Sequence, residues 1–425
     1  MMKMSIFWQR LLSFLVLTIL PLSTIAPRAI VPLFLVFFLS ISAYWLVQQT
    51  QINFKSIFNS IQITHGLIIL GFFLLWSLLS VVWSIDLQHT LYFWTKLLLL
   101  LLAGIGLSLM FQKLDKNFKS RLLLALMLGL IITNAWLMIE IKTQGKFLSL
   151  NKGEVFWLTY YNKALSLEVM LIWPILAYLN RFFKASPDQE VKYLALIFQL
   201  ILIFQTAFVI LNLEATTVKI AFIIGALVGI CSLIKERIIK WLLLSTCAAI
   251  FMAAPLLYKQ VLTPSTVANI THEFIEKPSF YHRLYIWRFV SDEILLKPWT
   301  GWGLDTSRHK HFAEKKILSD EIKKETPFLK VATLDLLPLH PHNLPLQLWL
   351  ELGFPGVFLI LYLISLIIFA IPRLFKEKFN RSAAYASFSS ALIVNIGSYG
   401  IWQSWWVSGL WLTIIFVKFL ESGND

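Results

Sequence analysis

Two histidines flank a proline at residues 340–342, directly before Asn343 and a long apolar run. The imidazole of histidine has an ordinary pKa of about 6.5, so at neutral pH it can accept a proton from a hydroxyl group. Pro341 restricts the backbone, and Asn343 is suited to cap a helix that begins at the next residue. We therefore predict that His342 is a general base, with His340 as a supporting group. A loop that only caps a helix and a His-x-His metal site are the alternatives, although no third ligand has a suggestive spacing.

A second candidate is the stretch YHRLYIWR at residues 281–288. Arg283 and Trp287 are four residues apart, so they share one face of the helix that we expect over 280–296. The guanidinium of Arg283 offers a fork of two parallel hydrogen-bond donors that suits phosphate, and Arg288 supplies a second guanidinium. Trp287 can stack on a sugar ring. An amphipathic helix at the membrane interface, with arginines that reach toward water, is the alternative.

A third candidate is Lys219, which follows Glu214 close to the beginning of an apolar run. A charge inside hydrocarbon costs at least a few kcal/mol, so the ammonium group needs a partner or a water-filled cavity. Lys219 is either an anion contact or the partner of Glu214 in an ion pair. The sequence leaves both interpretations open.

The elements that must position these residues are membrane helices. The chain has 425 residues, of which 58% are hydrophobic and 14% are charged. In soluble domains about a quarter of all residues are charged. Repeated runs of about 20 apolar residues exclude a soluble enzyme, and backbone groups in hydrocarbon must bond internally as helices. We predict an all-α polytopic membrane protein, with about twelve spans at 6–26, 29–48, 64–84, 90–111, 122–141, 163–180, 193–213, 215–234, 240–257, 344–371, 383–400 and 402–420.

The net charge of +14 is distributed along the chain in a way that argues against nucleic acid as a partner. Basic residues gather in alternate breaks between the spans, which is the pattern of cytoplasmic loops. We therefore predict cytoplasmic termini and a large loop on the opposite side. The expected organisation is 1–257 with nine spans, 258–342 as a loop domain, and 343–425 with three spans.

The loop at 258–342 holds six of the eight histidines of the chain. Its charges are nearly balanced, so it is expected to fold rather than to form a cationic tail. The stretch 314–325 alternates in charge sign and predicts a solvated helix. Asp305 and Asp335 are the candidates for a carboxylate beside His342. Walker and GxGxxG motifs are absent from the sequence, so we expect chemistry that uses no ATP.

The end of the loop resembles a signature of the O-antigen ligase/O-antigen polymerase superfamily. That signature has His, then Asn, Ser or Gln, then nine residues, then Gly-x-x-Gly, often followed by Thr-Trp. Here His342 and Asn343 are followed by nine residues and by GFPG at 353–356, with Val-Phe in place of Thr-Trp. The stretch 280–303 also looks like the family's loop. Lys219 stands where ligases usually carry an arginine, and its single ammonium keeps the charge without the fork.

The resemblance implies a GT-C-like glycosyltransferase in the bacterial inner membrane, with its site facing the periplasm. The donor would be an undecaprenyl-diphosphate-linked glycan, and the acceptor would be a sugar of the lipid A core. Membrane lipids would surround the protein. In this implied reaction His342 is the general base, and Arg283 and Lys219 neutralise the diphosphate. The configuration at the anomeric carbon would be inverted. Neither a metal nor another cofactor would be required. Trp287, Arg288, His340 and Asn343 would contribute to substrate binding.

Two other functions stay open at this point. The first is the same chemistry with another acceptor, as in an O-antigen polymerase or a protein O-oligosaccharyltransferase. Polymerases often have arginine, ten residues and glycine in their loops, and neither Arg283 nor Arg288 has that spacing, which favours a ligase. The second is a transporter, which should have paired broken spans and ion sites at the midplane of the membrane.

Overall fold

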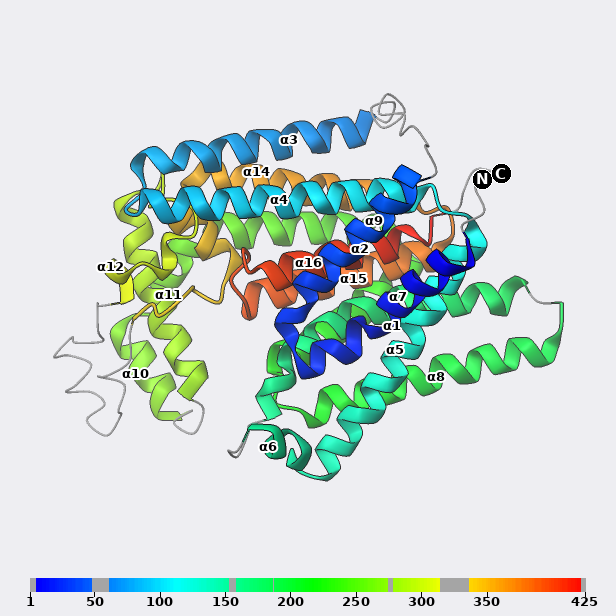
Figure 1. Cartoon of the computed structure of the whole chain (residues 1–425). Coiled ribbons are helices and arrows are strands. Elements are labelled where there is room, and N and C mark those ends of the chain that lie inside the picture. Colours follow the sequence, from blue (N-terminus) through cyan, green and yellow to red (C-terminus); the bar gives the residue numbers. More distant parts are fainter. Residues whose placement is uncertain are drawn as a thin grey trace.

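The computed structural model describes residues 5–47, 61–152, 158–185, 187–273, 278–313 and 336–421, and within these ranges it contains helices and no strand. The long helices form one elongated bundle (Figure 1). In the described part of the chain, nine helices are long and apolar enough to cross a membrane. The all-α, multi-pass membrane class predicted from composition is thereby confirmed.

The nine long helices follow the apolar runs of the sequence, because an isolated strand in hydrocarbon would leave its backbone groups without partners. They are α1 (Ile6–Ile25), α2 (Ile30–Val47), α3 (Ile61–Leu79), α4 (Leu87–Gln112), α5 (Lys116–Lys142), α7 (Asn162–Ala185), α8 (Gln189–Asn212), α9 (Thr216–Val261) and α14 (Leu344–Leu374). The bundle also contains α6 (Lys146–Lys152), α15 (Lys378–Gly397) and α16 (Ser404–Lys418).

Helix α9 contains one break, at Lys235, whose φ of −136° and ψ of 58° are not helical. The sequence predicts a break at this place, between the spans at 215–234 and 240–257. The first arm of α9 packs closely on α15, where a Cβ on Gly225 would lie 2.2 Å from Ser390 Oγ. The second arm packs on α14, where Trp349 Nε1 donates to Phe251 O at 2.7 Å. One helix thus carries two of the predicted spans, and the total of twelve stays a prediction.

The breaks between helices gather at two ends of the bundle, as the charge pattern predicts. At one end Arg181 Nη2 donates to Leu420 O at 2.8 Å, and Arg381 Nε lies 3.0 Å from Glu236 Oε2. We call this the basic end. The other breaks meet at the opposite end, where the long loop has nearly balanced charges and no excess of basic residues comparable to the basic end. Which end faces the cytoplasm stays a prediction.

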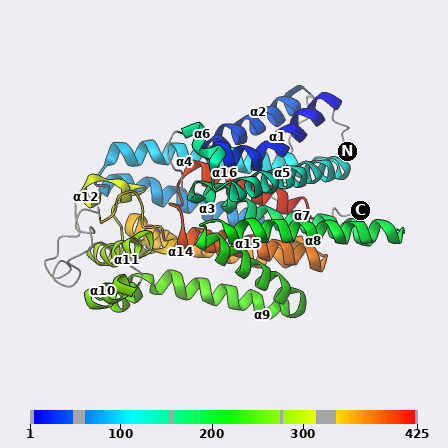
Figure 2. The same cartoon turned by 90° about the horizontal axis from the view of Figure 1, so that it is seen from below.

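Helices α10 (Pro264–Glu273), α11 (Pro278–Leu296) and α12 (Lys310–Ala313) lie together at the end opposite to the basic end, which we call the α11 end (Figures 1 and 2). Helix α11 confirms the helix predicted over 280–296. The predicted solvated helix at 314–325 lies outside the described residues. The domain boundaries at 257 and 342 stay predictions, although α10 to α12 fall between them.

The turn at residues 298–303 docks against a kink in α14 at Gly353, where φ is 61°. Pro355 has no N–H group, so the carbonyl of Glu351 loses its helical partner, and Gly303 N donates to it instead at 2.9 Å. Phe354 N donates to Pro298 O at 2.9 Å. A Cβ on Gly353 would lie only 2.4 Å from Trp299 O. Gly353, the first glycine of the GxxG motif, is therefore a docking notch for the backbone of the turn.

Candidate active site

Asn343 links the loop to α14 as the N-cap of that helix. Its Oδ1 accepts from Leu346 N at 3.1 Å, and its Nδ2 donates to Tyr258 Oη at 3.1 Å, so both ends of the buried amide are occupied. This confirms the cap predicted from the sequence. One N–H and one lone pair of the amide are used by these contacts, so Asn343 fixes the start of the helix, and its predicted contact with substrate stays a prediction.

His342 stands immediately before this cap with a φ of 53°, a left-handed conformation that is rare for residues other than glycine. Its Nδ1 forms a short hydrogen bond with the carbonyl oxygen of Ser398. A carbonyl oxygen can only accept, so Nδ1 carries the proton and the lone pair of Nε2 is free. In the described part of the chain Nε2 has no hydrogen-bond partner, and the residue is half-buried. The imidazole is thus held in the tautomer that can act as a base.

The charge state of His342 follows from its surroundings. Burial and the positive charge of Arg283 lower the pKa of His342 to about 4, and the hydrogen bond to Ser398 offsets this only in part. The nearby His282 also lowers this pKa. The imidazole is therefore neutral at pH 7 and can accept a proton.

His340 is packed beneath His342, with the two ring centres 4.1 Å apart. It is 4% exposed, its Nδ1 accepts from His342 N at 3.3 Å, and its Nε2 lies 3.0 Å from the amide nitrogen of Gln403. Burial lowers the pKa of His340 to about 3, helped by His342, Arg308 and Arg283. His340 is a neutral positioning group, since both of its ring nitrogens already face protein atoms.

Arg283 and Trp287 bring one face of α11 against the histidines. Arg283 Nη1 donates to Gly397 O at 2.8 Å, next to the carbonyl that holds His342. Trp287 Nε1 donates to Pro341 O at 2.8 Å, and its ring lies 5.1 Å from that of Tyr258. The structure thus brings Arg283 and His342 together, and the roles predicted for them stay predictions. Trp287 holds the loop between the histidines, and no sugar contact is needed to explain it.

Arg288 points to another part of the structure. Its Nη1 forms a short hydrogen bond with Lys259 O, and its Nε lies 3.1 Å from Asp292 Oδ2. Lys259 Nζ completes the group at 3.2 Å from Asp292 Oδ1. Residues five apart on a helix differ by about 140° in direction, so Arg288 cannot share the face of Arg283. Arg288 ties α11 to α9, and we do not assign it a substrate contact.

The ammonium group of Lys219 is not brought to the histidines either. Its Nζ donates to Leu211 O at 2.8 Å, and no ion pair joins it to Glu214, which is also a described residue. The neighbouring Thr217 does reach the site, because its Oγ1 donates to Gly397 O at 3.2 Å. Residues two apart lie on nearly opposite sides of a helix, so Lys219 faces the turn between α8 and α9.

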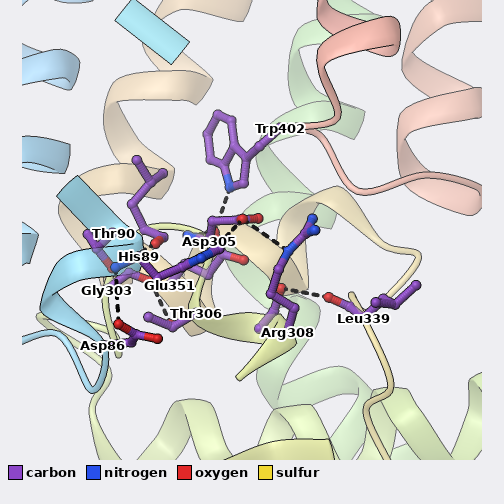
Figure 3. Close-up of polar contacts among 12 residues, drawn as sticks. Asp86, His89, Thr90, Gly303, Asp305, Thr306, Arg308, Leu339, Glu351 and Trp402 are labelled. Carbon is purple, nitrogen blue, oxygen red and sulfur yellow. Dashed lines mark hydrogen bonds and ion pairs between the residues drawn. The ribbon is translucent and has the colours of Figure 1, made fainter. Parts of the chain in front are cut away.

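A buried polar network at the α11 end was not foreseen from the sequence (Figure 3). Asp305 is fully buried, and its Oδ2 lies 2.9 Å from His89 Nε2 and 3.0 Å from Arg308 Nε. Glu351 Oε2 accepts from Asp305 N at 2.9 Å and from Trp402 Nε1 at 2.5 Å. Asp305 is thus not the carboxylate of His342, and Asp335 lies outside the described residues.

The network has little local signal in the sequence, because its members come from distant segments. His89 and Asp305 are 216 residues apart. The one short-range indication of the network in the sequence is that Asp305 and Arg308 are three residues apart and follow the turn at residues 298–303. Within the described ranges, no group of three His, Cys, Asp or Glu side chains is arranged to hold a metal ion.

Comparison with known proteins supports the motif read at the end of the loop. Residues 200–361 match the family model described as O-Antigen ligase. Over these residues the chain is similar to the O-antigen ligase family. The matched region runs from α8 into α14, so it contains Arg283, Arg308, His342 and Gly353.

Two proteins to which the chain is similar are named "Putative polysaccharide ligase". One, from Rickettsia typhi, is 31% identical over 49% of this chain and 49% of its own length. Another, from Rickettsia conorii, is 27% identical over 83% of this chain and 78% of its own length. The chain thus spans about half the length of the first of these relatives.

Proposed function

We propose that the chain is a glycosyltransferase that moves an O-antigen glycan from undecaprenyl diphosphate to a sugar of the lipid A core. We place it in the bacterial inner membrane, with the α11 end in the periplasm. The observation that carries the proposal is His342 itself, a neutral imidazole with a free Nε2 beside the Arg283 guanidinium. The family match and the names of the relatives favour a ligase over a polymerase or a protein O-oligosaccharyltransferase.

The proposed reaction needs few groups. His342 Nε2 takes the proton of the acceptor hydroxyl as its oxygen bonds to the anomeric carbon of the donor. The bond between that carbon and the diphosphate oxygen breaks, and the electron pair leaves with the lipid diphosphate. Arg283 stabilises the charge that develops there. Attack from the face opposite the diphosphate inverts the anomeric centre, and the reaction uses neither a metal nor ATP.

Reconstitution of the purified chain in vesicles tests this function. Donor glycan on undecaprenyl diphosphate and core lipid A are supplied together, with and without a chelator, and the lipid A product is separated on a gel. We expect transfer that depends on both lipids and is insensitive to the chelator. Transfer only onto another donor glycan would instead assign a polymerase, and no transfer onto either acceptor would contradict the proposal.

The pH dependence of kcat/KM follows from the lowered pKa of His342. The base works when it is deprotonated, so its contribution is present above the pKa and is lost as the pH falls through about 4. We expect that transfer at pH 5.5 keeps more than about half of its rate at pH 7.5. Initial rates between pH 4.5 and 8 check this. Loss of half the rate near pH 6.5 would show that the imidazole is not shielded as described.

Replacing Arg283 by glutamine should change two quantities at once. The KM for the lipid-linked donor should rise about tenfold, because a charged hydrogen bond to phosphate is lost. The acid limb of the pH profile should move to higher pH, because the charge of Arg283 lowers the pKa of His342. Arg283→Lys is the matched control, since it keeps the charge and should keep the limb. An unchanged KM together with an unchanged limb would contradict the assignment.

A further inference from the structure

Arg308 is a cation at the candidate site that the reaction above does not use. It ends the short turn η5 (Thr306–Arg308), which follows Asp305 in a left-handed conformation with φ 57°. The turn is held firmly, since Asp305 N donates to Glu351 Oε2 and Thr306 Oγ1 donates to Gly303 O at 2.6 Å. The position of Arg308 is therefore set by backbone and buried contacts, not by a mobile loop.

The guanidinium of Arg308 is paired with a carboxylate at its Nε edge, and its Cζ lies 5.8 Å from the centre of the Phe93 ring. Its Nε lies 3.0 Å from Asp305 Oδ2, while the carboxylate is fully buried and also contacts His89. Nη1 and Nη2 have no hydrogen-bond partner in the described part of the chain, and 33% of the side chain is exposed. An arginine anchored through Nε presents its two outer nitrogens as a fork for an anion.

The turn that carries this fork contacts the segment that leads into His340. Ser307 Oγ donates to Leu339 O at 3.2 Å, so the residue before Arg308 contacts the residue before His340 (Figure 3 shows Arg308 next to Leu339). The positive charge of Arg308, like that of Arg283, also lowers the pKa of His340. Two guanidinium groups from separate segments, α11 and η5, therefore act on the same buried imidazole.

We propose that Arg308 is a second binding residue for the diphosphate of the carrier lipid, with Asp305 as the residue that positions it. The inference rests on the proposed function, because it assumes a diphosphate-linked donor. A diphosphate has two phosphate groups, and a guanidinium fork can bind each of them. Arg308 supplies the second cation that Lys219 and Arg288, both engaged elsewhere, do not supply.

The test measures binding of inorganic pyrophosphate to the purified full chain, together with the KM for the lipid-linked donor. Arg308→Gln should weaken pyrophosphate binding and raise KM, each by about tenfold or more, with a smaller change in kcat. Arg308→Lys should lie between the two, because it keeps the charge without the fork. Arg237→Gln, at the exposed break of α9, is the matched control and should behave like the wild type.

A double variant separates binding from stability. Arg308→Gln leaves Asp305 with fewer partners, and Arg308→Gln with Asp305→Asn removes that unpaired charge. If the double variant regains wild-type pyrophosphate binding, the loss came from the buried carboxylate and the proposal is overturned. Wild-type binding by Arg308→Gln, or no binding by the wild type, overturns it as well. A wild type that binds pyrophosphate through Arg308 but transfers no glycan would instead refute the proposed function alone.

Discussion

Replacing His342 by alanine is expected to lower kcat/KM for glycan transfer by about 10²- to 10⁴-fold, the range that a positioned general base contributes. The loss should appear in kcat rather than in donor binding, because in the proposed mechanism Nε2 acts on the acceptor hydroxyl and Arg283 holds the diphosphate. The side chain makes one hydrogen bond, to Ser398 O, and the residue is half-buried. Truncation should therefore leave the melting temperature close to that of the wild type. Glycan transfer by the reconstituted variant measures kcat and KM, and thermal unfolding of the same preparation measures the melting temperature.

His65→Ala is the matched control for this prediction, since His65 is an exposed residue of α3 and none of the contacts of the site involve it. It should transfer glycan at the wild-type rate. Undiminished transfer by the His342 variant would rule out a base at this position. A variant that melts far below the wild type would show that the residue has a structural role, contrary to the contacts described here.

Replacing Gly353 by alanine should lower the free energy of unfolding by about 3 kcal/mol. The left-handed φ of 61° disfavours any side chain, and the new Cβ would lie 2.4 Å from Trp299 O and 2.5 Å from the carbonyl carbon of Trp299. These are backbone atoms, which cannot rotate away. The turn that carries Asp305 and Arg308 should therefore separate from α14, and transfer should fall together with the melting temperature.

Gly71→Ala provides the comparison within the same bundle, because a Cβ at Gly71 in α3 would meet nothing within 4 Å. Alanine is also the better helix former, so this variant should be as stable as the wild type or slightly more stable. Equal stability of the Gly353 and Gly71 variants would contradict the docking of the turn in the notch.

The sequence predicts the helices well because hydrocarbon leaves few choices for an apolar run of about 20 residues. The sequence also predicts the structure well where a single contact between residues close in the chain decides it. Asn343 caps α14 through an atom three residues away, and the spacing of Arg283 and Trp287 places both on one face of α11.

The sequence does not show which contacts form between distant segments. Lys219 occupies the expected place in the chain, yet its Nζ is directed to Leu211 O. Arg308 has little signal in the sequence beyond its spacing from Asp305, because its environment depends on His89 of another helix and on the fold of the turn. The role of Gly353 was visible only as a motif, since the atom that excludes a side chain belongs to Trp299.

A structure of the full chain with undecaprenyl diphosphate bound tests the central claim most directly. We predict that the diphosphate lies at the α11 end, within hydrogen-bonding distance of the Arg283 guanidinium, with His342 Nε2 facing the position of the anomeric carbon. A diphosphate bound at the basic end, or on the far side of α9 beside Lys219 and away from His342, would contradict the mechanism proposed here.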